Sequence, residues 1–235
     1  MAHAPIRRAA RAVDRLVGWA VGMPLATLRF LIRRTPFEDR VVCGGREEPG
    51  TVRRRYRVRI ERPRLPAPTV AAVVLADPNA VLPVEVMRFS PGGAQAGPLR
   101  AGQRRLIRMA GPWNGPVRIE EVGEEGFRFA ALHGGAQRGE VVYRLRDDGE
   151  AIDAEVSITQ RSASRLYDLI YHRLGIARRI ERHTWAYVLE RTAQLAGGRP
   201  PERVVVETLV SDRSRRPPGR RPGGLRRWAR RARRR

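Results

Sequence analysis

From Thr51 onward, apolar and polar residues alternate with a period of two through several short segments, which turn sequences separate. In the segment RRYRVRI, Tyr56, Val58 and Ile60 fall on one side, and arginines occupy the positions between them. This alternation is typical of a β-strand that buries one face and exposes the other. The chain is therefore expected to form an antiparallel sheet with one apolar face.

The same alternation predicts further strands over residues 104–109, 117–122, 126–132, 140–146 and 152–159. Turn sequences separate them, such as GPWNGP between the first two and DDG between the last two. A shorter strand is expected around residues 86–89, and residues 203–210 are expected to form either one more strand or a docked edge segment. The Ala-rich stretch 69–83 is interrupted by the letters DPN, which predicts two short helices around a turn.

A single long helix is predicted to follow these strands. Ser162 or Ser164 can cap its first turn, and the helix runs to Ala196 before two glycines that stop it. Apolar residues recur along it at spacings of three, four and seven, which gives a stripe that must pack against the sheet. The expected fold class is α+β, with a curved antiparallel sheet of about six to seven strands packed on a long C-terminal helix.

Positive charge is concentrated at the two ends of the chain. All 47 basic residues are arginine, and of the net charge of +23, residues 1–34 carry +6 and residues 213–235 carry +12, which leaves +5 for residues 35–212. We therefore expect a helical arm over 1–34, one folded domain over 35–212 and a disordered Arg-rich tail over 213–235. The use of arginine alone indicates either a GC-rich coding sequence or selection for bidentate contacts with anions.

The first arm contains an uncharged run from Leu16 to Leu28. Three alternatives are open for it: packing on its own domain, lying on a membrane surface, or spanning a membrane. The run is shorter than the ~17–25 residues of a spanning helix, and Pro24 should divide it. Cys43 is the only cysteine, which excludes an internal disulfide and fits the cytoplasm, with peripheral attachment at the inner membrane as a further option.

Both arms are expected to attract polyanions through interactions that salt screens. The tail ends in RRWARRARRR, in which one aromatic ring lies among cations. This composition suits anionic lipid headgroups, or nucleic-acid phosphates with a stacking ring, and a solvated tail without a dedicated partner would have the same composition. The residues assigned to this contact are Arg226, Arg227, Trp228, Arg230 and Arg231.

The order of a strand, two small helices, a run of antiparallel strands and one closing helix resembles the helix-grip fold of the START and polyketide-cyclase-like (SRPBCC) superfamily. Residues 54–198 resemble an actinobacterial-type branch of an uncharacterised family placed near that superfamily. The segments that carry the resemblance are MAGPWNGPVRI, FRFAALHGG with GEVVYR, and LYDLIYHRLGIARRIERHTWAYVLER with LAGG. The family implies no particular activity. This chain has HGG at residues 133–135 where the family tends to have Gly-His, and Glu181 where a Gln is usual.

The sequence contains no hydrolase elbow, P-loop, dinucleotide fingerprint or His-x-x-x-His pair. No catalytic residue, metal site or cofactor is therefore assigned. A pocket between the sheet and the helix is expected to bind a ligand through aromatic and turn residues, although aromatic stripes usually indicate core. The ligand-binding candidates are Trp113, Phe127, Phe129, His133, Tyr143, Tyr171 and Trp185.

Several of these residues have simpler explanations. Trp113 is either a packing plug over one end of the sheet or a lid on a ligand, and His133 is either solvated in its turn or in contact with a ligand. His172 and His183 lie three helical turns apart, which is too far to share a metal, so each is expected on the surface or packed. Tyr171 and Glu181 could face one cavity together with Asp168, but a solvated helix face explains them better.

The leading hypothesis is a non-catalytic helix-grip protein that binds a small hydrophobic molecule or lipid and attaches to the membrane surface through both arms. The alternative is a nucleic-acid-associated protein that uses the Arg-rich tail. A lesser alternative is an enzyme of the cyclase or dehydratase kind with a polar pair in the cavity.

Overall fold

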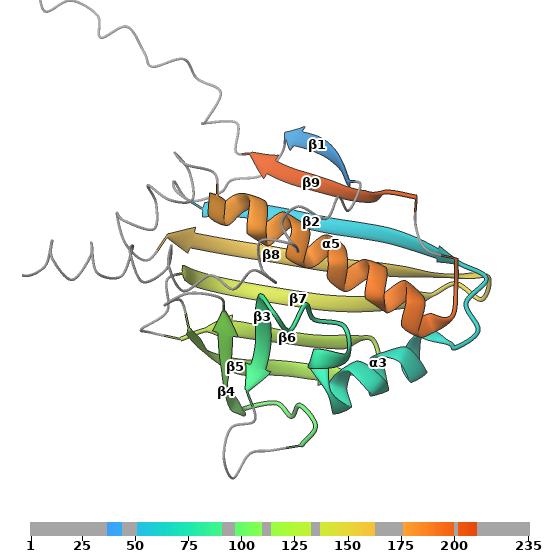
Figure 1. The fold of residues 1–235 in the computed structure, drawn as a ribbon, viewed down its shortest axis with the longest axis horizontal. Helices are drawn as coiled ribbons and strands as arrows, with labels where there is room; N and C mark the ends of the chain where they lie inside the picture. Colours follow the sequence, from blue (N-terminus) through green and yellow to red (C-terminus); the bar gives the residue numbers. More distant parts are fainter. Residues whose placement is uncertain are drawn as a thin grey trace, which may run out of the picture.

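The computed structural model describes residues 37–43, 51–90, 97–109, 114–132, 137–162, 176–199 and 202–210. The two predicted arms, residues 1–34 and 213–235, lie outside these ranges. The described elements, in chain order, are β1 (Phe37–Cys43), β2 (Thr51–Glu61), α3 (Ala67–Ala76), the 3-10 turn η1 (Pro78–Ala80), β3 (Met87–Ser90), β4 (Arg104–Met109), β5 (Gly115–Gly123), β6 (Gly126–Ala131), β7 (Gln137–Asp147), β8 (Ala151–Ser162), α5 (Ile176–Ala196) and β9 (Val204–Val210) (Figure 1).

Within the described residues the strands form one sheet of nine, in the order β1-β9-β2-β8-β7-β6-β5-β4-β3. Every neighbouring pair is antiparallel except β1 and β9, which run parallel from the Phe37–Val204 pair to the Cys43–Val210 pair. The sheet bends strongly, so that β3 and β4 cross the direction of the longer strands (Figure 1). The fold class is α+β, as predicted.

Two parts of the sheet prediction were wrong. The sheet has nine strands rather than six or seven, and it is mixed rather than purely antiparallel. The missed strand is β1, whose sequence FEDRVVC has three charged residues in a row and no regular alternation. Its parallel pairing with β9 joins residues about 170 positions apart, as in Phe37 with Val204, and such a pairing leaves no local signature.

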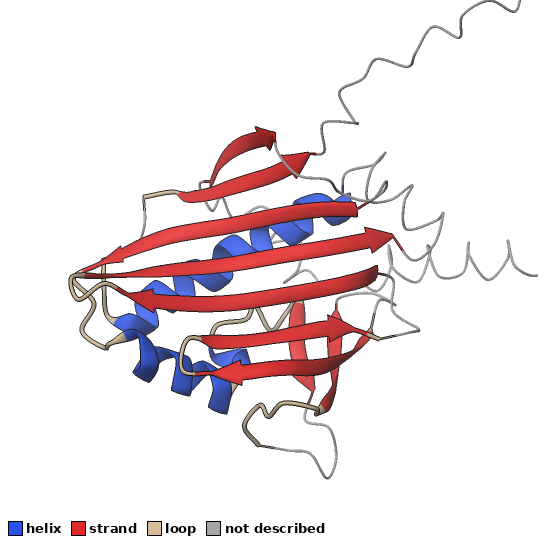
Figure 2. Ribbon diagram, turned by 180° about the vertical axis from the view of Figure 1, so that it is seen from behind, coloured by secondary structure: helices blue, strands red, loops and turns tan. Residues whose placement is uncertain are grey.

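Helix α5 lies along the concave face of the sheet, which curves around it (Figure 2). Trp185, Val188 and Leu189 are among its buried residues, and the apolar face of β2 lies beneath the helix. A sheet that holds one long helix is the arrangement that the helix-grip resemblance implies. Because Ser162 belongs to β8, the helix does not begin there, and residues 163–175 lie outside the described part of the chain.

The two short helices predicted over residues 69–83 correspond to α3 and η1. Pro66 and Pro68 favour the start of α3, and Asp77 ends it in an extended conformation. The Asp77 carboxylate then accepts a hydrogen bond from the amide of Asn79. The Asn79 side chain in turn bonds both backbone groups of Phe89, which fixes β3 beside this turn.

The core fills the space between the concave face and the two helices. The alternation in RRYRVRI is confirmed, since Tyr56, Val58 and Ile60 are buried. Aromatic rings from β3, β6 and β7 meet in edge-to-face, stacked and tilted pairs, with centroids 5.5 to 6.2 Å apart between Phe89, Phe127, Phe129 and Tyr143. No helix in the described part of the chain is long and apolar enough to cross a membrane.

Candidate functional site

A pocket of about 100 Å³ lies between the sheet and α5. Its wall is mostly apolar and comes from six strands and the helix, with Met87, Ile107, Val117, Phe129, Ile158 and Trp185 among the lining residues. Its volume is about two thirds of that of the engineered apolar cavity of ~150 Å³ that holds benzene. The described pocket is therefore the size of a small apolar group.

The structure separates the described ligand-binding candidates into two groups. Phe129 and Trp185 line the pocket. Phe127 and Tyr143 are buried behind Phe129, where the Phe127 ring contacts both of the other rings. The first pair can touch a ligand in this pocket directly, while Phe127 and Tyr143 line a different hollow, at the β5–β6 hairpin.

Trp113, His133 and Tyr171 lie outside the described residues. The chain on either side of Trp113 reaches the pocket, because Met109 and Gly115 both line it. Ala131 and Arg138, on either side of His133, line it as well. Both connecting segments therefore begin and end near the same pocket.

A buried polar cluster borders this pocket. Glu181 of α5 is 9% exposed and accepts a hydrogen bond from the Arg54 guanidinium of β2 at 2.7 Å. The Tyr56 hydroxyl donates to the same carboxylate oxygen at 3.1 Å, and the Gln160 amide nitrogen of β8 donates to the other oxygen at 2.5 Å. Gln160 also lines the pocket, so the cluster gives the apolar pocket one polar side.

The expectation that Glu181 lies on a solvated helix face was wrong. Three donors from two strands surround its carboxylate, and a buried carboxylate needs such partners. Sequence reasoning missed the site as a whole, although Arg54 is in phase with Tyr56 on the buried face of β2. The position of Arg54 in this alternation could have indicated the site, because an arginine on an apolar face requires a buried acceptor.

Tyr143 is not placed for acid–base chemistry. Its hydroxyl pairs with the Thr192 hydroxyl of α5 at 3.0 Å, and Thr192 itself donates to the backbone oxygen of Val188. Burial raises the pKa of Tyr143 well above its usual value of 10, despite the hydrogen bond with Thr192. The phenol therefore stays protonated and holds β7 against the helix.

His183 is buried, which agrees with the second of the two expectations for it, a packed rather than a surface position. Its ring meets the edge of Phe37 of β1 with centroids 5.6 Å apart, and its Nδ1 atom has no hydrogen-bond partner among the described residues. Beside it, Arg182 pairs with Asp39 at 2.9 Å. These contacts attach the edge strand β1 to the helix.

His183 should make the protein less stable as the pH decreases below 6.5. Burial, with the nearby Arg179 charge, lowers the pKa of His183 below its usual 6.5. As the pH falls below 6.5, the unfolded chain takes up a proton that the folded chain does not bind. The free energy of unfolding should decrease by up to ~1.4 kcal/mol per pH unit until the folded pKa is reached. Urea unfolding of the wild type and of His183→Gln at several pH values measures this slope, and equal slopes in both proteins would contradict the assignment.

The outer face of the sheet carries a hollow of about 480 Å³ over β2, β7, β8 and β9. The acidic row Asp153 and Glu155 of β8 lies between arginine rows on β2 and β7, and direct cross-strand pairs join the rows, such as Glu155 with Arg57 and with Arg144. Burial raises the pKa of Glu155, but a hydrogen bond from Ser157 and the Arg55 and Arg57 charges outweigh it, so the pKa is lowered. These opposite charges satisfy one another.

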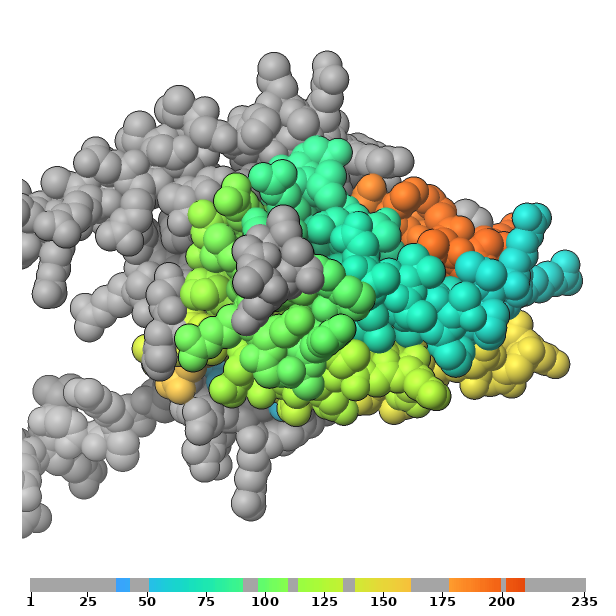
Figure 3. Space-filling model, turned by 90° about the horizontal axis from the view of Figure 1, so that it is seen from below, coloured from blue at the N-terminus to red at the C-terminus, as the bar shows by residue number. Residues whose placement is uncertain are grey.

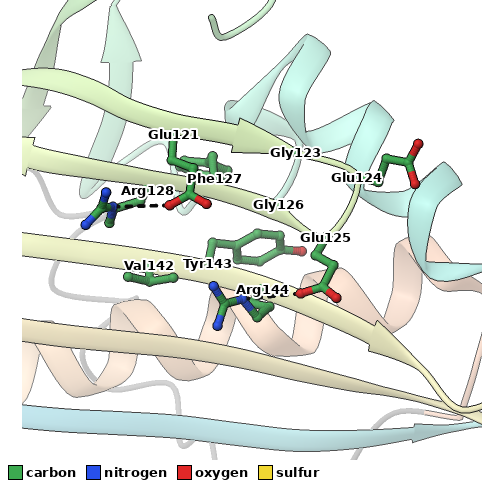
Figure 4. A pocket seen from close by; sticks show the side chains of 10 residues that line it. All are labelled: Glu121, Gly123, Glu124, Glu125, Gly126, Phe127, Arg128, Val142, Tyr143 and Arg144. Carbon is green, nitrogen blue, oxygen red and sulfur yellow. Dashed lines mark ion pairs between the residues drawn. The ribbon is translucent and has the colours of Figure 1, made fainter. Parts of the chain in front are cut away.

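A second outer hollow, of about 360 Å³, lies at the β5–β6 hairpin (Figure 4). Glu121 pairs with Arg128 at 3.4 Å and Glu125 pairs with Arg144 at 3.4 Å, as the dashed lines show (Figure 4). Gly123 and Gly126 are among its lining residues, and two of its carboxylates are thus paired with its arginines. Among the described residues, no three potential metal ligands lie together.

No family model and no curated protein matches the chain. The solved structures that resemble it include DynU16, described as a putative protein in the dynemicin biosynthetic locus (17% identity, TM-score 0.39, 63% of this chain and 49% of that chain), a hypothetical protein from Helicobacter pylori (10%, 0.43, 60% and 86%) and a norcoclaurine synthase from Thalictrum flavum (14%, 0.38, 60% and 95%). The match thus spans about half the length of DynU16. At these TM-scores and identities, no conclusion about a ligand or an activity follows from the likeness.

Proposed function

We propose that this protein binds a small apolar molecule, or an apolar part of a lipid, between the sheet and α5. The observation that carries the proposal is the apolar pocket beneath Trp185, together with the polar side that Gln160 provides. An apolar wall with a few convergent polar groups is the usual composition of a small-molecule site. The buried carboxylate cluster is fully engaged in holding the helix, so a binding role agrees better with it than a catalytic one.

The proposed site includes Phe129 and Trp185 as direct contacts. We propose Trp113, His133 and Tyr171 as further ligand contacts, and these three lie outside the residues that the structure describes. A ligand with one ring and one hydrogen-bonding group would suit this combination of side chains.

The proposal has a second part, which is peripheral attachment through the two basic arms. It is supported by the charges of +6 and +12 that the arms carry. Anionic lipid headgroups attract such segments with about 1 kcal/mol per basic residue near the surface. Nucleic acid is the alternative partner for the same charge, and binding to it would decrease steeply with salt.

Ala131 offers a direct test of the pocket, because its side chain lines the pocket and that of Ala130 lies on the opposite face of the same strand. Ala131→Leu should fill much of the volume and abolish binding, while Ala130→Leu should leave binding unchanged. Native mass spectrometry of protein purified from its own host detects any bound molecule. The benzene-dependent rise of the unfolding temperature provides a second readout.

The same two variants can also contradict the proposed binding site. If Ala131→Leu keeps the same bound mass and the same benzene response as the wild type, the pocket is not the binding site. Circular dichroism of both variants shows whether the fold is preserved.

A further inference from the structure

The outer face of the three strands β3, β4 and β5 places arginine directly opposite arginine. Arg88 of β3 faces Arg108 of β4, and Arg104 of β4 faces Arg118 of β5. All four side chains are exposed. Like charges at directly opposite positions of an antiparallel pair destabilise the sheet.

One other pair of exposed arginines lies directly opposite on the sheet, Arg138 of β7 with Arg161 of β8. Six arginines of β2, β6 and β7 lie 2.7 to 3.8 Å from carboxylates, namely Arg55, Arg57, Arg59, Arg128, Arg144 and Arg146. Arg118 pairs with Glu120 at 2.8 Å. In the part of the chain that the structure describes, Arg88, Arg104 and Arg108 have neither an ion pair nor a side-chain hydrogen bond. The six outer arginines of β2, β6 and β7 are thus neutralised by nearby carboxylates, whereas the three at the β3–β4 end are not.

Two apolar side chains lie between the unpaired charges. Leu106 of β4 faces Pro116 of β5, on the same face as Arg104 and Arg108, and both are half-buried. The resulting surface, which we call the β3–β5 arginine patch, comprises Arg88, Arg104, Leu106, Arg108, Pro116 and Arg118. Figure 3 views the molecule from the side on which these strands and α3 lie.

We propose that the β3–β5 arginine patch docks on an anionic lipid bilayer, with the guanidinium groups at the phosphates. Arginine forms bidentate contacts with phosphate groups, and apolar side chains among cations are suited to the boundary between headgroups and acyl chains. Single-stranded nucleic acid suits the patch less well. Phe89, the one aromatic residue in the described part of these strands, is buried, so the face has no ring on which a base can stack.

This surface lies directly behind the proposed ligand pocket. The inner faces of the same three strands supply Met87, Ile107 and Val117 to the pocket wall. A bilayer on the patch would therefore be separated from the pocket by a single sheet. The inference goes beyond the proposed ligand binding and does not depend on it.

The test uses full-length protein and two triple variants of equal charge. Arg88→Gln with Arg104→Gln and Arg108→Gln removes the unpaired charges, while Arg57→Gln with Arg144→Gln and Arg146→Gln removes three paired ones. Flotation with vesicles of equal parts phosphatidylglycerol and phosphatidylcholine measures partitioning. About fivefold per arginine, or roughly a hundredfold in total, should be lost by the patch variant. The control variant should lose less than about tenfold, because its arginines are already neutralised.

Equal losses in the two variants, or no loss in the patch variant, would overturn the proposal. So would unchanged vesicle binding combined with a reduced affinity for double-stranded RNA, which would identify nucleic acid as the partner instead. Thermal unfolding excludes a structural explanation: the patch variant should be at least as stable as the wild type, because like charges have been removed, and a lower unfolding temperature would count against the proposal.

Discussion

Glu181→Ala is expected to lower the free energy of unfolding by about 3–5 kcal/mol. The substitution leaves the Arg54 guanidinium buried without its carboxylate, and it removes the acceptor of Tyr56 and Gln160 at the same time. Removing one partner of a buried ion pair is more costly than the loss of a single neutral hydrogen bond. Urea unfolding followed by far-UV circular dichroism measures the change.

The matched controls separate the charge from the packing. Glu181→Leu combined with Arg54→Leu removes both charges and should lie close to wild-type stability, since apolar replacements of buried pairs are often neutral. Glu181→Gln, which introduces the residue usual in the resembling family, keeps the shape but not the charge and should be intermediate. If the double variant is as unstable as Glu181→Ala, the carboxylate is not held by Arg54 in the way the structure shows.

This cluster also decides where the helix lies. Arg54 and Tyr56 of β2 and Gln160 of β8 all bind one carboxylate near the start of α5, and the Tyr143–Thr192 hydrogen bond fixes the helix further along. The position of Trp185 over the pocket depends on these two attachments. The apolar pocket is thus bounded by polar contacts that specify one arrangement of helix and sheet.

Much of the fold could be predicted from local pattern. The alternation along β2 and β8 identifies both strands and the face that each buries, because the period of a strand acts over neighbouring residues. The Asp147-Asp148-Gly149 turn identifies the hairpin between β7 and β8 in the same way. The long apolar stripe similarly indicated a helix that packs on the sheet.

The features that were missed depend on long-range pairing. Arg54 and Glu181 are 127 positions apart, and no period in the sequence connects them. The parallel pairing of β1 with β9 has the same cause. The opposed arginines Arg88 and Arg108 require the register between two strands, which the sequence of either strand alone does not contain.

Gly139 shows how tightly β7 and β8 approach each other. It lies in β7 opposite Gln160 and has a φ of +143°, a conformation that side chains other than hydrogen disfavour. A Cβ atom at this position would overlap the backbone carbonyl of Thr159 in β8. The neighbouring strand cannot yield without breaking its ladder of hydrogen bonds with β7 or with β2.

Gly139→Ala is therefore expected to lower the free energy of unfolding by at least about 3 kcal/mol, as the sum of backbone strain and steric overlap. Gly149→Ala is the matched control, because Gly149 has a φ of +89° and an added Cβ would meet nothing within 4 Å. The control retains only the strain and should lose about 1 kcal/mol. Urea unfolding of both variants gives the difference. Equal losses of unfolding free energy in the two variants would mean that β8 does not approach Gly139 closely. This result would contradict the close packing of Gly139 against β8 in the pocket wall.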